Sequence, residues 1–274
     1  MPVKLEGCHV APQISIRWLT IACFEVRVGD FAIVIDPCVG ASPATDFGAE
    51  VIERADLILI SHGHWDHITD LEALAARCDC PILCGELTAP SLIRMLNANP
   101  ARVYPMTPDL ELDFGAVRVR ALFARHTDQR MRLSELSRRL AENPWNDTPE
   151  KLACNFYGNL EYRNYLITAP SGLKVLFWGS NASAEQLAMA RALRPDIGLM
   201  QYTKQSAEDL AALARESGMK VIFPHHMDLS QDEQTYMARV DELEKTLRAQ
   251  APGCVAIHPQ RSRWYAFGLG MAAR

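Results

Sequence analysis

The residues with the clearest chemical potential lie in the stretch LILISHGHWDHITD, positions 57 to 70. His62, His64, Asp66 and His67 follow directly after an apolar run that predicts a buried strand. Residues two apart in an extended chain point to the same side, so His62 and His64 can hold one ion together. Asp66 and His67 come as the chain turns into a helix and can face a second ion. Imidazole and carboxylate ligands favour zinc, iron or manganese over copper(I).

Other predicted strands also end in polar side chains. Besides the histidine cluster, these are Asp36, His126, Ser180 with Asn181, Tyr202, and His225 with His226. Sites in layered α/β folds gather at the carboxyl ends of strands. We therefore expect these strand ends to converge on one pocket.

The elements that must position these side chains follow from the hydrophobic pattern. Residues 14–37 predict two or three strands with a turn at Gly29-Asp30. Farther along, short apolar runs alternate with segments of helical spacing. One such helix is expected to begin at Thr69, where Thr69 and Glu72 match a capping box. The last two apolar segments predict edge strands. The pattern indicates an α/β fold with helices packed outside the sheets.

Composition bounds the remaining possibilities. The chain has 274 residues, 49% of them hydrophobic, which suits one large domain or at most two small ones. Its net charge of -5 indicates no basic surface for binding nucleic acid or an anionic membrane. We find no signal peptide and no apolar window of the ~18 residues that a membrane span needs. The eight cysteines are interpreted as reduced thiols of a cytoplasmic protein. The cluster CDCPILC lacks the usual spacing of a structural zinc site.

The H-x-H-x-D-H run in residues 62–67 is the signature of the metallo-β-lactamase fold superfamily. The resemblance extends from about residue 14 to 268, because GDFAIVIDP, ARHT, KVLFWGSN and VIFPHHMD resemble later motifs of that family in the right order. It implies one domain over residues 1–274, an αββα sandwich of two mixed β-sheets flanked by helices. The Pro-x-His ending is most similar to the L-ascorbate-6-phosphate lactonase-like branch of metal-dependent hydrolases.

The resemblance also implies roles for individual residues. It assigns two groups of metal ligands, His62, His64 and His126 in the first and Asp66, His67 and His226 in the second. His226 is preferred to His225 because Pro224 then stands two positions before it. The implied cofactor is one or two divalent ions, zinc or manganese ahead of iron. An activated water would attack a small anionic ester, lactone or phosphoester, with Asp66 orienting the water or accepting its proton.

One departure from the family pattern concerns the motif after strand KVLFW. The family has an aspartate that bridges two metals after this glycine, whereas here Ser180 follows Gly179. A hydroxyl is a poorer ligand than a carboxylate, so the second metal is expected to bind weakly. The alternative is a non-catalytic metal-binding or ligand-sensing protein. Ser180, Asn181 and His225 remain candidates for contact with metal or substrate.

An insertion at about residues 127–164 separates two core strands. It contains helical spacing and then a strand, and it starts beside His126, so we expect an ordered segment that covers the pocket. Candidate substrate contacts are Arg130, Tyr162 and Arg163, with Tyr202 and Lys204 further along. For each of these residues the alternative is a solvated surface side chain.

The expected partner is a small-molecule substrate, with no nucleic acid and no membrane, and a homo-oligomer is left open. A nuclease is the less favoured alternative at this charge. An oxidoreductase of the flavodiiron type would need a flavin domain, which this sequence lacks.

Overall fold

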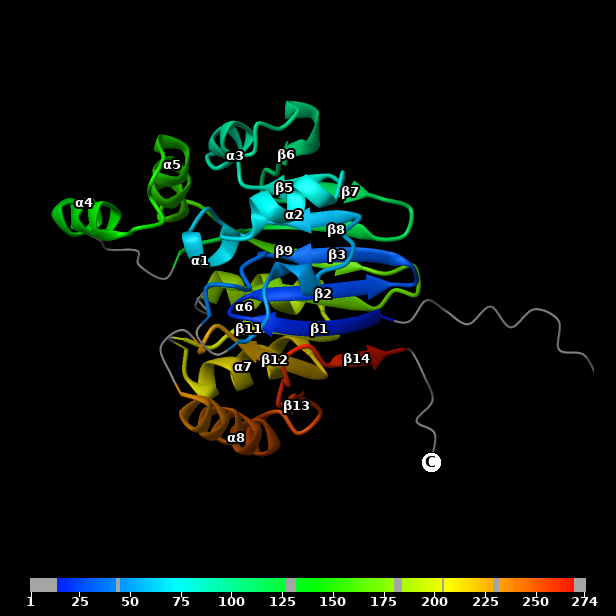
Figure 1. Ribbon diagram of the computed structural model, residues 1–274. Coiled ribbons are helices and arrows are strands. Elements are labelled where there is room, and N and C mark those ends of the chain that lie inside the picture. The colour runs from blue at the N-terminus through cyan, green and yellow to red at the C-terminus, as the bar shows by residue number, and fades with distance from the viewer. Residues whose placement is uncertain are drawn as a thin grey trace, which may run out of the picture.

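Two seven-stranded β-sheets form the centre of the molecule (Figure 1). The computed structural model describes residues 14–42, 45–126, 132–179, 184–203, 205–228 and 232–268. The first sheet has the order β14-β1-β2-β3-β4-β5-β6, with β1 Ile14–Thr20, β2 Cys23–Val28, β3 Phe31–Ile35, β4 Leu57–Leu59, β5 Ile82–Cys84, β6 Val103–Pro105 and β14 Trp264–Phe267. The second has the order β13-β12-β11-β10-β9-β8-β7, with β7 Glu111–Asp113, β8 Arg118–Ala124, β9 Tyr162–Thr168, β10 Lys174–Trp178, β11 Ile197–Gln201, β12 Val221–His225 and β13 Val255–Ala256.

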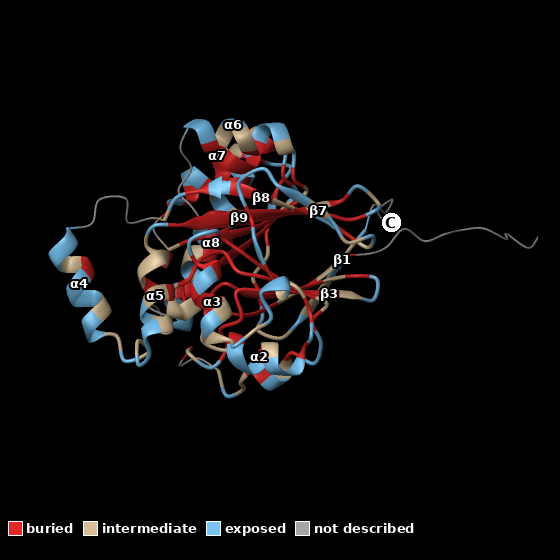
Figure 2. Cartoon of the chain, turned by 90° about the horizontal axis from the view of Figure 1, so that it is seen from above, coloured by how far each residue is buried: buried red, intermediate tan, exposed pale blue. Residues whose placement is uncertain are grey.

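Both sheets are mixed, and both have their helices on the outside. Strands β3 to β6 run parallel while β1 and β2 pair antiparallel, and the second sheet divides in the same way between β10–β13 and β7–β9. In Figure 2, α2 (Leu71–Arg77) and α3 (Ala89–Met95) lie on the β3 side of the sheets, while α7 (Ala207–Ser217) lies on the opposite side, beyond β8 and β9, and α8 (Glu233–Gln250) packs against α7. Apart from the two helices of the insertion, the other helices of the described residues are α1 (Trp65–Ile68), α6 (Ala184–Leu193) and the 3-10 turns Ala49–Val51 and Pro100–Arg102. The expected αββα sandwich of two mixed β-sheets is therefore confirmed.

Strand periodicity explains why the sheets stack. Ile33 and Ile35 of β3 belong to the core between the sheets, whereas Val34 belongs to the core under the first helical layer. Leu57 and Leu59 of β4 point into the same central core. Apolar residues on both faces are what a strand needs when it is covered by a sheet on one side and by helices on the other. Figure 2 shows the central strands, such as β9, buried between the outer helices, while edge strands such as β7 have exposed residues.

Several local predictions can be compared with the structure. The turn at Gly29-Asp30 is confirmed, with Gly29 at a φ of +58°, and the last two strands, β14 and β13, are edge strands. The capping box at Thr69 is wrong, because α2 begins at Leu71. The Thr69 hydroxyl instead donates to the carbonyl of Trp65, at 2.5 Å, one turn earlier in α1.

The insertion contributes two helices. α4 (Leu133–Glu142) corresponds to the expected helical segment, and α5 (Pro149–Gly158) was not predicted. Thr148 caps the N-terminus of α5, and its hydroxyl accepts from the backbone N–H of Lys151 at 3.2 Å. It packs against α1 and α3, whereas α4 contacts α5 and stands away from the sheets (Figures 1 and 2).

No helix in the described part of the chain is long and apolar enough to cross a membrane. The described cysteines, Cys23, Cys38, Cys78, Cys80, Cys84, Cys154 and Cys254, are all buried free thiols. Burial raises the pKa of the Cys80 and Cys154 thiols to about 12. No grouping of the CDCPILC cysteines suitable for a metal occurs among the described residues.

Candidate metal centre

One edge of the second sheet collects polar groups from five neighbouring strands. In spatial order, His126 follows β8, Tyr162 begins β9, Gly179 follows β10, Gln201 ends β11 and His226 follows β12. β9 runs antiparallel to β8 and β10, so its first residue lies at the edge where those two strands end. The loop after β4 meets this edge from the first sheet. The directions of the strands therefore bring these polar side chains together at one edge of the sheet.

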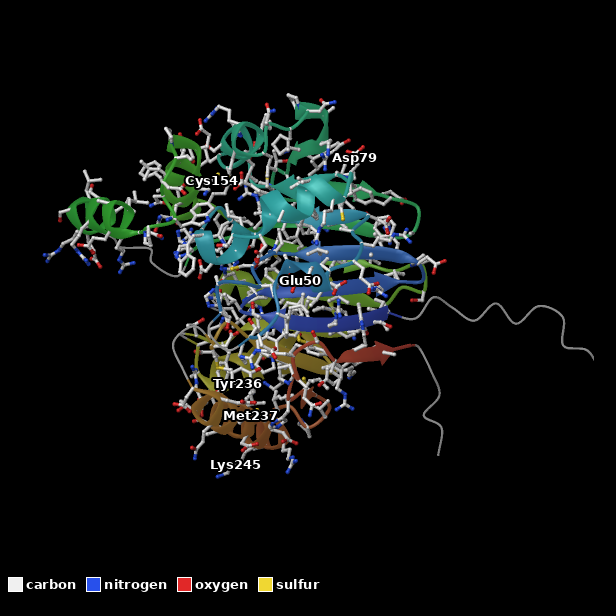
Figure 3. The ribbon with its side chains drawn as sticks, in the orientation of Figure 1. Glu50, Asp79, Cys154, Tyr236, Met237 and Lys245 are labelled. Atoms are coloured by element: carbon white, nitrogen blue, oxygen red, sulfur yellow. The ribbon has the colours of Figure 1, made fainter. Side chains whose placement is uncertain are left out.

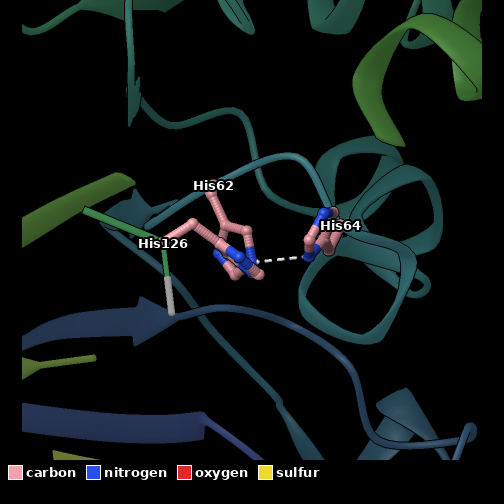
Figure 4. Close-up of side chains that lie close together, drawn as sticks. All are labelled: His62, His64 and His126. Atoms are coloured by element: carbon pink, nitrogen blue, oxygen red, sulfur yellow. Dashed lines mark hydrogen bonds between the residues drawn. The ribbon is translucent and has the colours of Figure 1, made fainter. Parts of the chain in front are cut away.

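The first group consists of His62, His64 and His126, whose ring nitrogens lie within 4.8 Å of one another. Figure 4 shows the three rings turned toward a common point. His62 Nε2 and His64 Nδ1 are 3.0 Å apart. Two Zn–N bonds of about 2.1 Å at the tetrahedral angle would separate their nitrogens by roughly 3.4 Å, about 0.4 Å more than this value, so the two rings are near enough to share one ion.

The second group consists of Asp66, His67 and His226. His67 Nε2 lies 3.0 Å from His226 Nε2, which in turn lies 3.4 Å from Asp66 Oδ2. Burial alone would raise the pKa of Asp66, but the charge of His67 and the hydrogen bond from His226 outweigh it and lower this pKa well below its usual range. The carboxylate is therefore ionised and ready to bind a cation.

Asp36 holds His67 in its orientation. Its carboxylate accepts from His67 Nδ1 at 2.7 Å, from the Ser61 hydroxyl at 2.6 Å and from the Ser61 backbone N–H at 2.7 Å. With the proton of His67 fixed on Nδ1, the Nε2 lone pair faces the second site. From the sequence, Asp36 was recognisable only as a polar residue at a strand end. Its backbone φ of +46° is a further sign of a constrained position.

The adjacent histidines His225 and His226 face different environments. His225 is completely buried between the rings of Phe24 and Phe177 and does not line the pocket. His226 has a φ of +69°, its N–H donates to the carbonyl of Ile21 at 2.9 Å, and its ring reaches the second group. The structure thus places His226, and not His225, at the site.

The protonation of the imidazoles suits metal binding. Burial, followed by the charge of His67, lowers the pKa of His62 well below its ordinary value, and burial lowers that of His64 to about 3. Burial would also lower the pKa of His67, but the charges of Asp36 and Asp66 outweigh it and raise this pKa. His62 and His64 are therefore neutral near pH 7, as a metal ligand must be. The donor set fits a divalent ion in each group.

The six side chains form the floor of a cavity of about 280 Å³. The insertion supplies much of its wall, through Leu136, Arg139, Leu140, Asn143, Asn155 and Asn159. Trp65 from the signature loop adds an aromatic surface. Among the described residues, Arg139 is the only lysine or arginine that lines this cavity.

α5 lies directly on the loop that carries the ligands. A Cβ on Gly63 would overlap the carbonyl of Cys154, and a Cβ on Gly158 would overlap His64. The glycines therefore allow helix and loop to approach closely. Cys154, fully buried, lies on the side of α5 that faces the domain (Figure 3).

Other sequence-predicted residues fall in different places. Tyr162 lines the cavity. Arg163 does not, which corrects its expected role as a substrate contact: the side chain is 8% exposed and donates to the carbonyl of Met106 at 3.0 Å and to Glu161 at 3.0 Å. Tyr202 is likewise buried away from the cavity, beneath the guanidinium of Arg239, so its expected contact is also corrected.

Four candidates, Arg130, Ser180, Asn181 and Lys204, lie outside the described residues. The cavity residues that the sequence analysis missed include Arg139, Gln201 and Thr203. Gln201 and Thr203 flank the Tyr202 that was chosen, so the strand end was correct but the side-chain direction was not. For Arg139 the sequence held a usable signal, namely the amphipathic spacing of its helix. Arg138 and Arg139 are adjacent and therefore point in different directions from the helix.

Sequence comparison gives matches to proteins named for metal-dependent hydrolysis. Residues 32–144 match the family described as Beta-lactamase superfamily domain. A UPF0173 metal-dependent hydrolase of Desulfitobacterium hafniense is 39% identical over 72 residues, 26% of this chain and 30% of that protein. A second, from Listeria innocua, is 22% identical over 81% of this chain and 90% of its own length. The chain thus spans under a third of the first relative and most of the other.

Structural comparison extends over nearly the whole chain. Igni18, a metallo hydrolase from Ignicoccus hospitalis, superimposes with a TM-score of 0.68 at 12% identity, covering 94% of this chain and all of that one. CmlA, a diiron β-hydroxylase from Streptomyces venezuelae, gives a TM-score of 0.62 at 14% identity, covering 96% of this chain and 55% of its own. At such identities the likeness shows the fold alone, and this fold carries more than one chemistry.

Proposed function

We propose that this chain, a metal-dependent hydrolase of the metallo-β-lactamase fold superfamily, cleaves a small anionic ester, lactone or phosphoester. The observation that carries the proposal is the convergence of two three-residue ligand groups at the floor of one cavity. A volume of about 280 Å³ lies at the small end of the usual range for ligand pockets, which supports a small substrate.

A bound divalent ion supplies Lewis acidity and lowers the pKa of a water molecule to about 7. We assign Asp66 the task of orienting the attacking water, because its carboxylate lies within the second ligand group. Trp65, Leu136 and Leu140 form the apolar part of the wall and exclude bulk water from the reacting bond.

Arg139 is our candidate for binding the anionic part of the substrate. Its guanidinium pairs with Glu135 at 2.7 Å on α4 and lines the cavity. It takes the role that the sequence analysis had given to Arg163. An arginine offers several donors in a fixed fork that matches carboxylate and phosphate oxygens.

Zinc or manganese is the proposed cofactor. Nitrogen donors suit zinc, and the Asp66 carboxylate suits manganese as well. The free thiols support a cytoplasmic location, where cysteines stay reduced. Nuclease activity is less favoured, since a net charge of -5 offers little attraction to a phosphate backbone, and salt-dependent filter binding would test it.

The decisive experiment assays purified protein against lactones, phosphomonoesters, phosphodiesters and thioesters. We expect turnover of one class that disappears with a chelator and returns with manganese or zinc. Arg139→Ala should raise the KM for the anionic substrate at least about tenfold, the loss of one charge-assisted hydrogen bond. Arg138→Ala is the matched control, because Arg138 is exposed on the same helix and pairs with Glu142.

The second candidate is a non-catalytic metal-binding or ligand-sensing protein. Ser180, which stands where the family has a bridging carboxylate, is the observation that favours it. Full metal loading without turnover of any substrate class would support this alternative over hydrolysis.

A further inference from the structure

Two buried oxygen atoms in the wall of the cavity lack hydrogen-bond partners. Within the described part of the chain, these are the phenol oxygen of Tyr162 and the amide oxygen of Gln201. Leaving a buried polar atom unpaired costs about 1–3 kcal/mol, so such atoms in a pocket wall point to a missing ligand. They lie on β9 and β11, the two strands that flank β10 and Gly179.

We propose that the phenol oxygen of Tyr162 is a ligand of the metal centre, replacing the carboxylate that this chain lacks after Gly179. The inference rests on the proposed metal-dependent function and adds a ligand to it. On binding, the oxygen–metal bond forms as the phenol O–H bond breaks and its proton passes to the buffer.

The position of the ring supports this assignment. The Tyr162 side chain is 2% exposed and lies beside His62, with ring centroids 4.5 Å apart, and near His126, at 6.3 Å. Its hydroxyl packs against Gly179, since a Cβ there would overlap the phenol oxygen. The hydroxyl is therefore directed to the end of β10, where the family carboxylate would follow.

The charges around the phenol favour a cation next to it. The carboxylates of Asp36 and Asp66 are close enough to the Tyr162 phenol to act on it electrostatically. Ser61 is the neighbouring hydroxyl, and its proton is already donated to Asp36 at 2.6 Å. A divalent ion would supply the positive charge that this surrounding lacks.

Accessibility distinguishes a metal from a substrate as the partner. The phenol oxygen is inaccessible to solvent, so no space the size of a water molecule adjoins it. A substrate oxygen needs at least that much room. A divalent ion is considerably smaller than water and would need less room beside the phenol oxygen.

Iron(III) is the probe for this ligand, because a phenolate bound to iron(III) gives a charge-transfer absorption band in the visible. Apo-protein is loaded with iron(III), and iron content and absorption are measured on the same sample. We expect the band in the wild type and its loss in Tyr162→Phe with the protein still folded. Tyr165→Phe is the matched control, since Tyr165 lies on the same strand but donates to the carbonyl of Ile60 at 2.8 Å; it should keep the band.

The outcomes separate this inference from the proposed function. Iron bound to the wild type without the band, or a band that survives Tyr162→Phe, would overturn the tyrosine ligand alone. A wild type that binds no metal at all would overturn the metal-dependent function as well. If Tyr162→Phe fails to fold, resonance Raman spectra of the wild type settle the question, because tyrosinate ring modes are enhanced only when the phenolate binds iron. Zinc affinity supplies an independent readout, with about a tenfold loss expected in Tyr162→Phe.

Discussion

Asp36→Asn tests whether the second metal site depends on the orientation of a single imidazole. Asp36 lies in the left-handed region, at a φ of +46°, and asparagine tolerates that region better than most residues. The substitution therefore changes the hydrogen bonds while leaving the backbone in place. Alanine would add strain at the same position and confuse the result.

The expected magnitude follows from the three hydrogen bonds that Asp36 accepts. An asparagine oxygen can still accept from the Ser61 N–H, but its amide group then faces His67 Nδ1, which lies 2.7 Å away in the wild type. Two donors cannot share this contact, so the proton of His67 moves to Nε2, which faces His226 Nε2 at 3.0 Å. Loss of such an orienting partner typically weakens metal affinity 10- to 100-fold, about 1.4–2.7 kcal/mol.

Calorimetric titration of the apo-protein with zinc and with manganese measures the effect. We expect the second site to weaken by that factor and the site formed by His62, His64 and His126 to keep its affinity. Asp56→Asn is the control, because Asp56 also accepts a backbone N–H, from Ala32 at 2.8 Å, at the opposite end of β3. Unchanged affinity of both sites in a folded Asp36→Asn protein would refute the orientation argument.

Three further predictions follow from the site and its surroundings. His64→Ala should abolish binding to the first site, whereas Asp66→Ala should chiefly weaken the second; elemental analysis of both variants checks this, and unchanged metal in both would end the metallohydrolase interpretation. Arg163→Ala should lower the free energy of unfolding by about 3–5 kcal/mol with KM unchanged, because it leaves Glu161 buried without its ion-pair partner; urea unfolding and substrate kinetics measure the two effects. Ser180→Asp should raise total metal toward two ions per chain, since a carboxylate offsets a further unit of the roughly +4 charge of two divalent ions; equal titration curves for variant and wild type would contradict it.

Short-range patterns in the sequence were sufficient to predict much of the site. The spacing of His62 and His64 places them on one side of an extended loop, and the continuous apolar runs of β3 and β4 predict strands that are buried on both faces. The structure brings together the same two groups of three that the resemblance implied. Both results depend on residues that are close in sequence or on the order of motifs along the chain.

Contacts between distant segments that the resemblance did not imply were not predicted. Asp36 reaches Ser61 only because the Asp36 N–H pairs with the carbonyl of Leu59, and this strand register is not encoded locally. The role of Arg163 likewise depends on Glu161, whose carboxylate also accepts from the backbone of Leu87 at 3.0 Å. An arginine in a pocket wall and one in a buried ion pair have the same appearance in a sequence.

The two ligand groups differ in chemistry, and this difference should determine the order in which ions bind. The first group offers three imidazoles and no carboxylate, while the second has Asp66 and the His67 imidazole backed by Asp36. Nitrogen donors suit zinc, and carboxylate oxygens suit manganese. Zinc should therefore fill the first group well before the second, and the two sites should differ less in their affinity for manganese.

If Tyr162 adds an oxygen to the centre, Tyr162→Phe should reduce manganese affinity more than zinc affinity. Parallel titrations with the two ions would reveal such a preference, and equal losses for both would indicate that the phenol oxygen does not select the metal.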